Sequence, residues 1–284
     1  MATQKQLYLL NRSRIQNPAS GDPRCLEFEQ PWINQHLCRI EQGPLPADLA
    51  GLKQQLAELV EIEANSPLES VDYVSTQMNL EEFRILVQEF SVDGLTEAQC
   101  FYYVLPRLTL EAQMPMLRIM IDEFGSGNLR RAHTTLYITL LKELDMPWDL
   151  DFYLQRIDED SFAFVNQFFW LARRADDPSY FAGAITYLET AIPYFFECYT
   201  RACMRLGIQA HHYYSEHQHI DIFHAQEGQR LLQAMQATRS LNPAKAWAGV
   251  RLASEITALA FENAVNKART LKQQDFSLAR RGAA

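Results

Sequence analysis

The stretch SYFAGAITYLETAIPYFF, residues 179–196, decides the fold class of this chain. Phe181, Ile185 and Leu188 recur at helical spacing, so the segment is predicted to be a helix with one apolar side. Glu189 lies inside that apolar stripe. An ionised carboxylate in such a place is costly unless it is paired with a cation or bound to a metal. The stretch therefore indicates a core helix that also bears a candidate functional residue.

The same helical periodicity recurs on both sides of this segment, whereas no alternating strand pattern and no internal repeat is found. Helices are expected near 48–64, 79–90, 97–108, 113–124, 129–144, 151–157, 160–173, 179–206, 212–237 and 244–271. We predict an all-α fold in which short connections favour antiparallel packing of neighbouring helices.

The domain organisation follows from where the breakers fall. Residues 1–44 hold four prolines and are expected to form an irregular N-terminal segment. Residues 45–272 are expected to form one helical domain. Residues 273–284 are expected to be a polar tail.

Composition excludes several classes of protein. The 26 Lys and Arg residues against 35 Asp and Glu residues give a net charge of −9, so no nucleic-acid partner is expected. The 48% of hydrophobic residues can supply a core, which excludes disorder. We find no signal peptide and no run near the roughly 18 apolar residues of a spanning helix, so no membrane association is expected. The five cysteines lack CxxC spacing and are interpreted as buried thiols of a cytoplasmic protein.

A cluster of potential metal ligands lies in HQHIDIFH, residues 217–224. His217, Asp221 and His224 fall at i, i+4 and i+7, which places them within about 60° of one another on a helix. Imidazole and carboxylate together suit iron, manganese or zinc. We interpret this face as a metal site.

Three further polar residues lie in or beside apolar stripes. Glu89 flanks its own stripe, Glu123 closes an apolar run, and His133 lies on the next helix. Each has an ordinary alternative: a solvated helix-edge carboxylate, a partner of a neighbouring arginine, and a hydrogen-bonded core histidine. Glu189 alone could likewise be half of a buried ion pair. Together, however, buried carboxylates on separate helices require positive charge between them.

Charge counting indicates the number of ions. Four carboxylates carry −4, two divalent ions carry +4, and three neutral imidazoles complete the set. The seven predicted metal ligands are Glu89, Glu123, His133, Glu189, His217, Asp221 and His224. One structural zinc would need four ligands in a closed shell, so it would use this set poorly. Two ions with open positions would support catalysis, and no catalytic residue beyond the ligands is predicted.

Three motifs in this order, DEFGSGNLRRAH (122–133), YLETAIP (187–193) and HQHIDIFH (217–224), carry a family resemblance. The chain resembles the haem-oxygenase-like diiron oxidases and oxygenases over roughly residues 65–265. The resemblance implies a haem-oxygenase-like helical bundle with iron bound by the ligands within these motifs. It also calls for a carboxylate from the first core helix, for which Glu89 is preferred, with Glu97 and Glu111 as alternatives. Ferritin-like diiron proteins use two Glu-x-x-His motifs, whereas only Glu216–His219 has that spacing here.

The resemblance also implies a function. Such a protein would use two iron ions, cycling between Fe(II) and Fe(III), to activate O₂ and oxidise a small metabolite. An amino acid, an amine or a fatty acid would undergo N-oxygenation, oxidative decarboxylation or fragmentation, or desaturation. An electron donor and a homodimer are expected on the same ground, and manganese in one of the two positions stays an open alternative.

The residues leave the substrate open. Arg118, Arg130 and Arg131 lie near the motif ligands and could meet a substrate carboxylate, although solvated helix-end arginines are the simpler interpretation. Two other classes of function were weighed. One is a metal-free helical binding or regulatory module whose odd carboxylates form ion pairs. The other is a haem-binding enzyme, for which this set of ligands is too hard and too anionic.

Overall fold

The central helix of the fold is α11 (Ser179–Phe195), and every residue of its first eleven is buried. Its neighbours are α13 (His212–Ala237) and α14 (Pro243–Thr270), the two longest helices. This computed structural model describes residues 3–21 and 23–271, which form fourteen α-helices and short 3₁₀ turns without any strand. The prediction of an all-α fold is confirmed.

Glycine lets these three helices approach closely. A Cβ atom at Gly183 of α11 would lie 1.9 Å from the carbonyl oxygen of Ala246 in α14, and one at Gly249 would lie 1.9 Å from that of Tyr180. Gly228 of α13 lies against Thr186 of α11 in the same way. Because the three helices pack so closely, the position of α11, which bears Glu189, is fixed.

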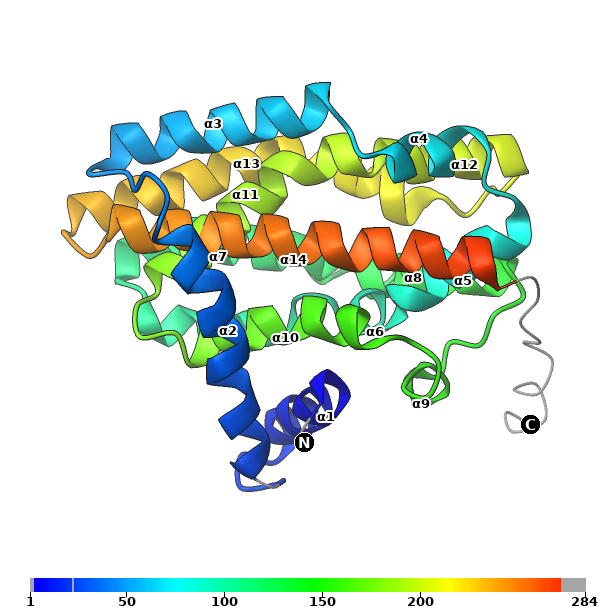
Figure 1. Cartoon of the computed structure of the whole chain (residues 1–284), viewed down its shortest axis with the longest axis horizontal. Helices are drawn as coiled ribbons and strands as arrows, with labels where there is room; N and C mark the ends of the chain where they lie inside the picture. Colours follow the sequence, from blue (N-terminus) through cyan, green and yellow to red (C-terminus); the bar gives the residue numbers. More distant parts are fainter. Residues whose placement is uncertain (1–2, 22, 272–284) are drawn as a thin grey trace.

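The other helices surround this centre, as Figure 1 shows, with α14 running across the middle of the view. They are α3 (Leu49–Asn65), α4 (Glu69–Thr76), α5 (Leu80–Glu89), α6 (Ser91–Gly94), α7 (Leu110–Glu123), α8 (His133–Glu143), α9 (Leu150–Tyr153), α10 (Glu159–Arg173) and α12 (Glu197–Leu206). α5 and α10 pack on α14, α7 packs on α13, and α3 lies on α11 and α14. α7 is thereby placed beside α13, and α5 beside α14, and both α13 and α14 pack directly on α11.

The expectation of an irregular segment at residues 1–44 is wrong. This segment forms α1 (Gln4–Gln16), which Thr3 caps, and α2 (Leu26–Ile40). α1 packs on α10 through polar contacts, because the Asn11 amide donates to Asn166 at 3.0 Å and the Asn166 amide donates to the Gln4 carbonyl at 2.8 Å. The prolines do not exclude these helices, because Pro18 lies between them and Pro31 lies within α2, whose buried residues Ile33, Leu37 and Ile40 are apolar. The predicted tail at 273–284 lies outside the described residues.

Three other expectations need correction. The predicted helix at 179–206 is two helices, since α11 ends at Phe195 and α12 begins at Glu197. The predicted helix at 97–108 is a pair of 3₁₀ helices, Glu97–Tyr103 and Leu105–Arg107. Helix α4 was not predicted. None of the helices in the described part of the chain is long and apolar enough to cross a membrane.

Candidate metal centre

Helix α13 presents His217, Asp221 and His224 on one buried face, as their spacing predicts. Glu189 faces them from α11, and its carboxylate oxygen lies 3.1 Å from Nδ1 of His224. Nδ1 of His217 donates a hydrogen bond to the carbonyl of Tyr213 at 2.7 Å. That bond fixes the His217 ring and leaves the lone pair on Nε2.

The DEFGSG turn brings the second pair of predicted ligands together. α7 ends at Glu123, the chain turns through Gly125, and α8 begins at His133. Gly125 has φ +62°, and a Cβ atom there would lie 2.5 Å from the backbone nitrogen of Ala132. Only glycine fits so tight a reversal. As a result Nδ1 of His133 lies 2.8 Å from a carboxylate oxygen of Glu123.

The side chains form two adjacent groups, each able to hold a metal ion. One comprises Glu97, His133 and His217, and the other comprises Glu123, Glu189 and His224; within each group the ligand atoms lie within 4.8 Å of one another. The groups are in contact, since Glu123 of the second group lies 2.8 Å from Nδ1 of His133 of the first. The donor set is therefore one of carboxylates and imidazoles, which suits iron.

Several buried polar atoms here have no hydrogen-bond partner within the part of the chain that the structure describes. They are both carboxylate oxygens of Asp221, Nε2 of His224 and Oε1 of Glu97. Buried polar atoms are normally satisfied, so a group of orphaned lone pairs in one place points to a missing cation. The residues present thus fit a metal site.

The pKa values of these side chains reflect the same lack of compensating positive charge. Burial raises the pKa of Asp221, and the nearby charge of Glu189 raises it further. Burial lowers the pKa of His217 to about 3. Although burial opposes it, contacts with Asp221 and Glu189 raise the pKa of His224 to about 11. Burial raises the pKa of Glu123, but the neighbouring His133 outweighs burial and lowers the pKa of that carboxyl to about 2. Without a bound cation, the carboxylates thus favour the protonated, positively charged form of the neighbouring imidazoles.

Glu89, preferred as the first-helix ligand, is not brought to either group. Its carboxylate receives hydrogen bonds from Lys267 Nζ at 2.6 Å, from the Ser161 hydroxyl at 2.6 Å and from the Asp158 backbone at 2.9 Å. Its buried charge is therefore already compensated by an ammonium. Among the alternatives, Glu97 belongs to the first group, whereas Glu111 is exposed at the start of α7.

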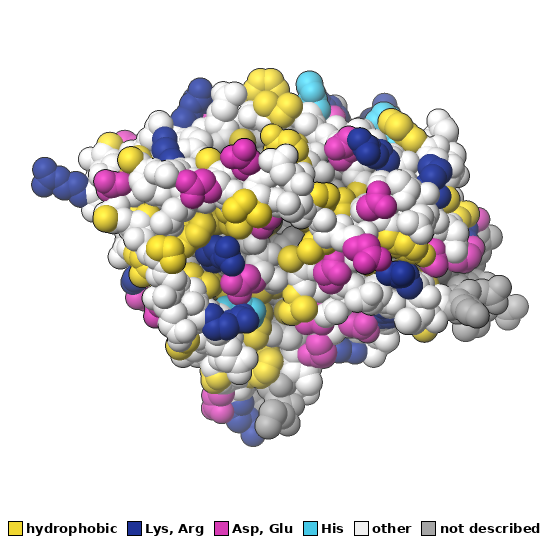
Figure 2. All heavy atoms as spheres, turned by 45° about the horizontal axis from the view of Figure 1, so that its top comes forward, with side chains coloured by type: hydrophobic (Ala, Val, Ile, Leu, Met, Phe, Trp, Pro, Cys, Tyr) yellow, Lys and Arg dark blue, Asp and Glu magenta, His cyan; other side chains and the backbone are white. Residues whose placement is uncertain are grey.

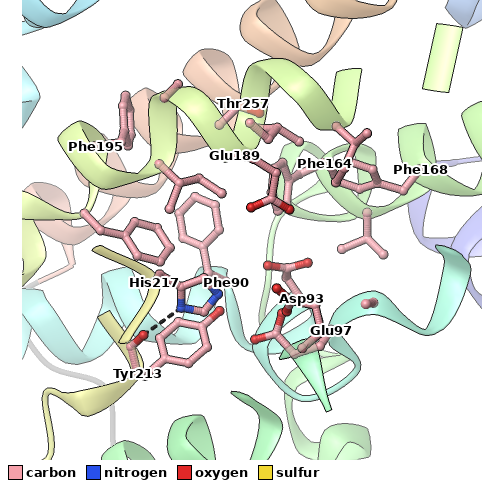
Figure 3. A pocket seen from close by; sticks show the side chains of 18 of the residues that line it. Phe90, Asp93, Glu97, Phe164, Phe168, Glu189, Phe195, Tyr213, His217 and Thr257 are labelled. Carbon is pink, nitrogen blue, oxygen red and sulfur yellow. Dashed lines mark hydrogen bonds between the residues drawn. The ribbon is translucent and has the colours of Figure 1, made fainter. Parts of the chain in front are cut away.

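Asp93 is a functional candidate that the sequence analysis did not identify. In Figure 3 the carboxylates of Asp93 and Glu97 point into the same space as that of Glu189. Burial and the charge of Glu123 raise the pKa of Asp93 to about 7. The signal was hidden because Asp93 lies in the short helix α6, where no long helical stripe exposes a misplaced acid.

A cavity of about 120 Å³ adjoins the groups. Its walls are mainly aromatic and aliphatic. They include Phe90, Phe101, Phe164, Phe168, Ile185, Leu188, Ile192, Phe195 and Phe196. The three arginines considered as substrate contacts do not line it: Arg118 pairs with Glu227 at 3.1 Å, Arg131 pairs with Glu216 at 3.3 Å, and Arg130 is exposed.

The fold and this pair of buried groups define an all-helical protein with a candidate two-metal centre. The family model of iron-containing redox enzymes matches residues 84–258, which is more than half of the chain. The chain belongs to this family of iron-containing redox enzymes, and its fold is the haem-oxygenase-like helical bundle. Family membership suggests an oxidoreductase. No curated protein matches the sequence.

Proposed function

We propose that this protein is a non-haem diiron oxidase or oxygenase that uses O₂ to oxidise a small metabolite. The observation that carries the proposal is the pair of adjacent buried groups, each with one or two carboxylates and one or two imidazoles. Family membership supports iron as the metal. A small-molecule substrate, an external electron donor and a homodimer belong to the same proposal.

In this proposal Glu97, His133 and His217 hold one ion, and Glu123, Glu189 and His224 hold the other. Asp221 adds a fourth carboxylate beside His224, at 3.3 Å. Four carboxylates against two divalent ions give a neutral centre, which is the condition for burying so many acids together. Glu97 thus takes the place for which Glu89 was preferred.

Two ferrous ions would supply the electrons and the open coordination positions that the reduction of O₂ requires. The protein's own part is positioning and exclusion. The Tyr213 carbonyl orients His217, the Gly125 turn holds Glu123 beside His133, and the phenylalanine walls keep bulk water from the centre.

Iron analysis combined with anaerobic ferrous reconstitution tests the proposal. Wild-type protein should take up two irons per chain and show an optical transient on exposure to O₂. His217→Ala and Glu189→Ala should lose iron and the transient. His219→Ala is the matched control, since His219 is exposed on the same helix as His217, and it should behave as wild type.

The metal-free alternative predicts a different result. If calorimetry finds no stoichiometric binding of Fe(II) or Mn(II), the chain is a binding or regulatory module that keeps the fold. Unchanged iron uptake in both His217→Ala and Glu189→Ala would likewise contradict the assignment of these ligands.

A further inference from the structure

Asp93 is held rigidly at the edge of the metal centre. It lies in the single turn of α6, and the next residue, Gly94, packs directly on the ring of Tyr137, where a Cβ atom would lie 2.5 Å from the ring. Tyr137 is itself fixed, because its hydroxyl donates to the Val87 carbonyl at 2.6 Å. The backbone that carries Asp93 therefore has little freedom to move its carboxylate away from the cavity.

The charge of Asp93 is not compensated. The carboxylates of Glu97, Glu123, Glu189 and Asp221 already balance two divalent ions, so Asp93 is a fifth acid. Among the described residues, no lysine, arginine or histidine lies within ion-pair distance of Asp93, in contrast to Glu89. The pKa of Asp93, raised by burial and by Glu123, reflects the same lack of a cation.

The cavity that Asp93 faces contains no lysine or arginine in its lining. A bound carboxylic acid would therefore meet no protein cation there, only the metal ions themselves. A cationic group would meet Asp93, and an apolar group would meet the phenylalanine side chains. Phe90, Phe164 and Phe168 line the cavity together with Asp93 and Glu189 (Figure 3).

A neighbouring groove has the same charge preference. Ala191 and Phe195 line both this cavity and an open groove between α3, α4, α11 and α12. The groove carries the acids Glu63, Asp72 and Glu197, and its one arginine, Arg201, pairs with Glu197 at 2.6 Å. In Figure 2, which brings the top of Figure 1 forward, acidic side chains are interspersed with apolar ones on this face. An acidic surface beside the cavity favours the approach of a cation over that of an anion.

We propose that Asp93 binds the ammonium group of a primary-amine substrate whose apolar part occupies the phenylalanine-lined cavity. This inference rests on the proposed diiron function and narrows its substrate from three classes to one. The ammonium donates hydrogen bonds to the Asp93 carboxylate, and the apolar part contacts the phenylalanine side chains that line the cavity. Asp93 is then a substrate-binding residue and not a metal ligand.

The test is calorimetric binding to the Fe(II)-loaded protein under anaerobic conditions. The probes are 2-phenylethylamine, 2-phenylethanol and phenylacetate, which share a ring and differ in charge. We expect the amine to bind at least tenfold more tightly than the alcohol. Asp93→Asn should weaken amine binding by about 10- to 100-fold, since the bond to a charged partner is lost, and should leave the alcohol unchanged. Glu111→Gln, an exposed acid, is the control and should match wild type.

Equal binding of the amine and the alcohol to wild-type protein would overturn the inference without reference to any variant. Amine binding that survives Asp93→Asn, or phenylacetate as the tightest probe, would do the same. Iron is counted on the same samples. Two irons in wild type but fewer in Asp93→Asn would make Asp93 a ligand, which overturns the inference and leaves the diiron function intact. No iron in wild type would overturn both.

Discussion

Glu89 and Glu97 are eight positions apart, and both lie in or beside a helix that borders the core. What separates them is Lys267, which donates to Glu89 from the last turn of α14. A buried carboxylate that is paired with an ammonium already has its charge compensated. A carboxylate with a buried oxygen that lacks a hydrogen-bond partner, such as Glu97, needs a cation from elsewhere. The distinction depends on a residue 178 positions away in the chain.

Glu89→Gln should therefore weaken the fold and spare the metal centre. Removing one partner of a buried ion pair costs about 3–5 kcal/mol, because Lys267 is left uncompensated. Urea unfolding would measure that loss, and iron analysis should still find two irons per chain. Glu81→Gln breaks a more exposed pair with Arg84 and should cost less than about 1 kcal/mol. A folded Glu89→Gln protein that has lost iron would restore Glu89 as a ligand.

Glu97→Gln is expected to have the opposite effect. It removes the only carboxylate of the first group, so the variant should fold with wild-type stability in the metal-free state and bind about one iron instead of two. Metal titration followed by optical spectroscopy measures this directly. The matched variant Glu111→Gln should keep both irons, and loss of iron there instead would show that the chain contributes a different carboxylate.

Spacing within one helix predicted the ligands that share that helix. His217, Asp221 and His224 follow from the helical repeat, whereas Glu123 and His133 were proposed from their places beside apolar stretches and from the family resemblance, and the glycine turn brings those two together. Asp93 was not found, and Glu97 was named only as an alternative to Glu89. Asp93 lies in the single-turn helix α6 and Glu97 begins a 3₁₀ helix, and the position of both depends on contacts distant in sequence. Periodicity needs several turns before a misplaced charge becomes visible.

At the scale of the element, α11 is the helix on which the centre is built. Gly183→Ala should destabilise the protein by about 3 kcal/mol or more, since its Cβ would meet backbone of α14 that has no room to move. Chemical denaturation measures the change. Gly51→Ala in α3 is the control, because its Cβ would make only ordinary contacts and should stabilise the helix by about 0.5–1 kcal/mol. Equal effects of the two substitutions would show that α11 and α14 do not pack as described.

The first two helices were missed because prolines were interpreted as breakers. Pro31 lies within α2, whose residues Ile33, Leu37 and Ile40 are buried, and a polar pair of Arg174 with Glu29 also holds this helix. The division of 179–206 into α11 and α12 occurs within an apolar run, where hydrophobicity continues although the helix does not. By contrast, the long helices α10, α13 and α14 were predicted within one residue at each end.

At the scale of the whole molecule, the net charge of −9 includes acids whose charge bound metal ions would balance. Four of the acids, Glu97, Glu123, Glu189 and Asp221, belong to the proposed centre, and two divalent ions would bring the loaded protein from −9 to −5. Without metal these acids repel one another in a buried space, which costs stability. The fold and the metal centre are therefore coupled.

Metal should accordingly raise the thermal stability of the protein. Ions that bind only the folded chain add about 2.7 kcal/mol per site at one hundred times their dissociation constant. Thermal unfolding with Fe(II) or Mn(II), compared with unfolding in a chelator, should show a midpoint that rises with metal concentration. The rise should shrink in Glu189→Ala. A midpoint that ignores metal concentration would contradict the coupling.

The most direct measurement of the central claim is a crystal structure of the Fe(II)-loaded protein with anomalous scattering at the iron edge. The account predicts two peaks per chain within bonding distance of the two groups, one served by Glu97 and His133 and the other by Glu123 and Glu189. Asp93 should face the cavity without touching either peak. A single peak, no peak, or iron bound to Glu89 would contradict it.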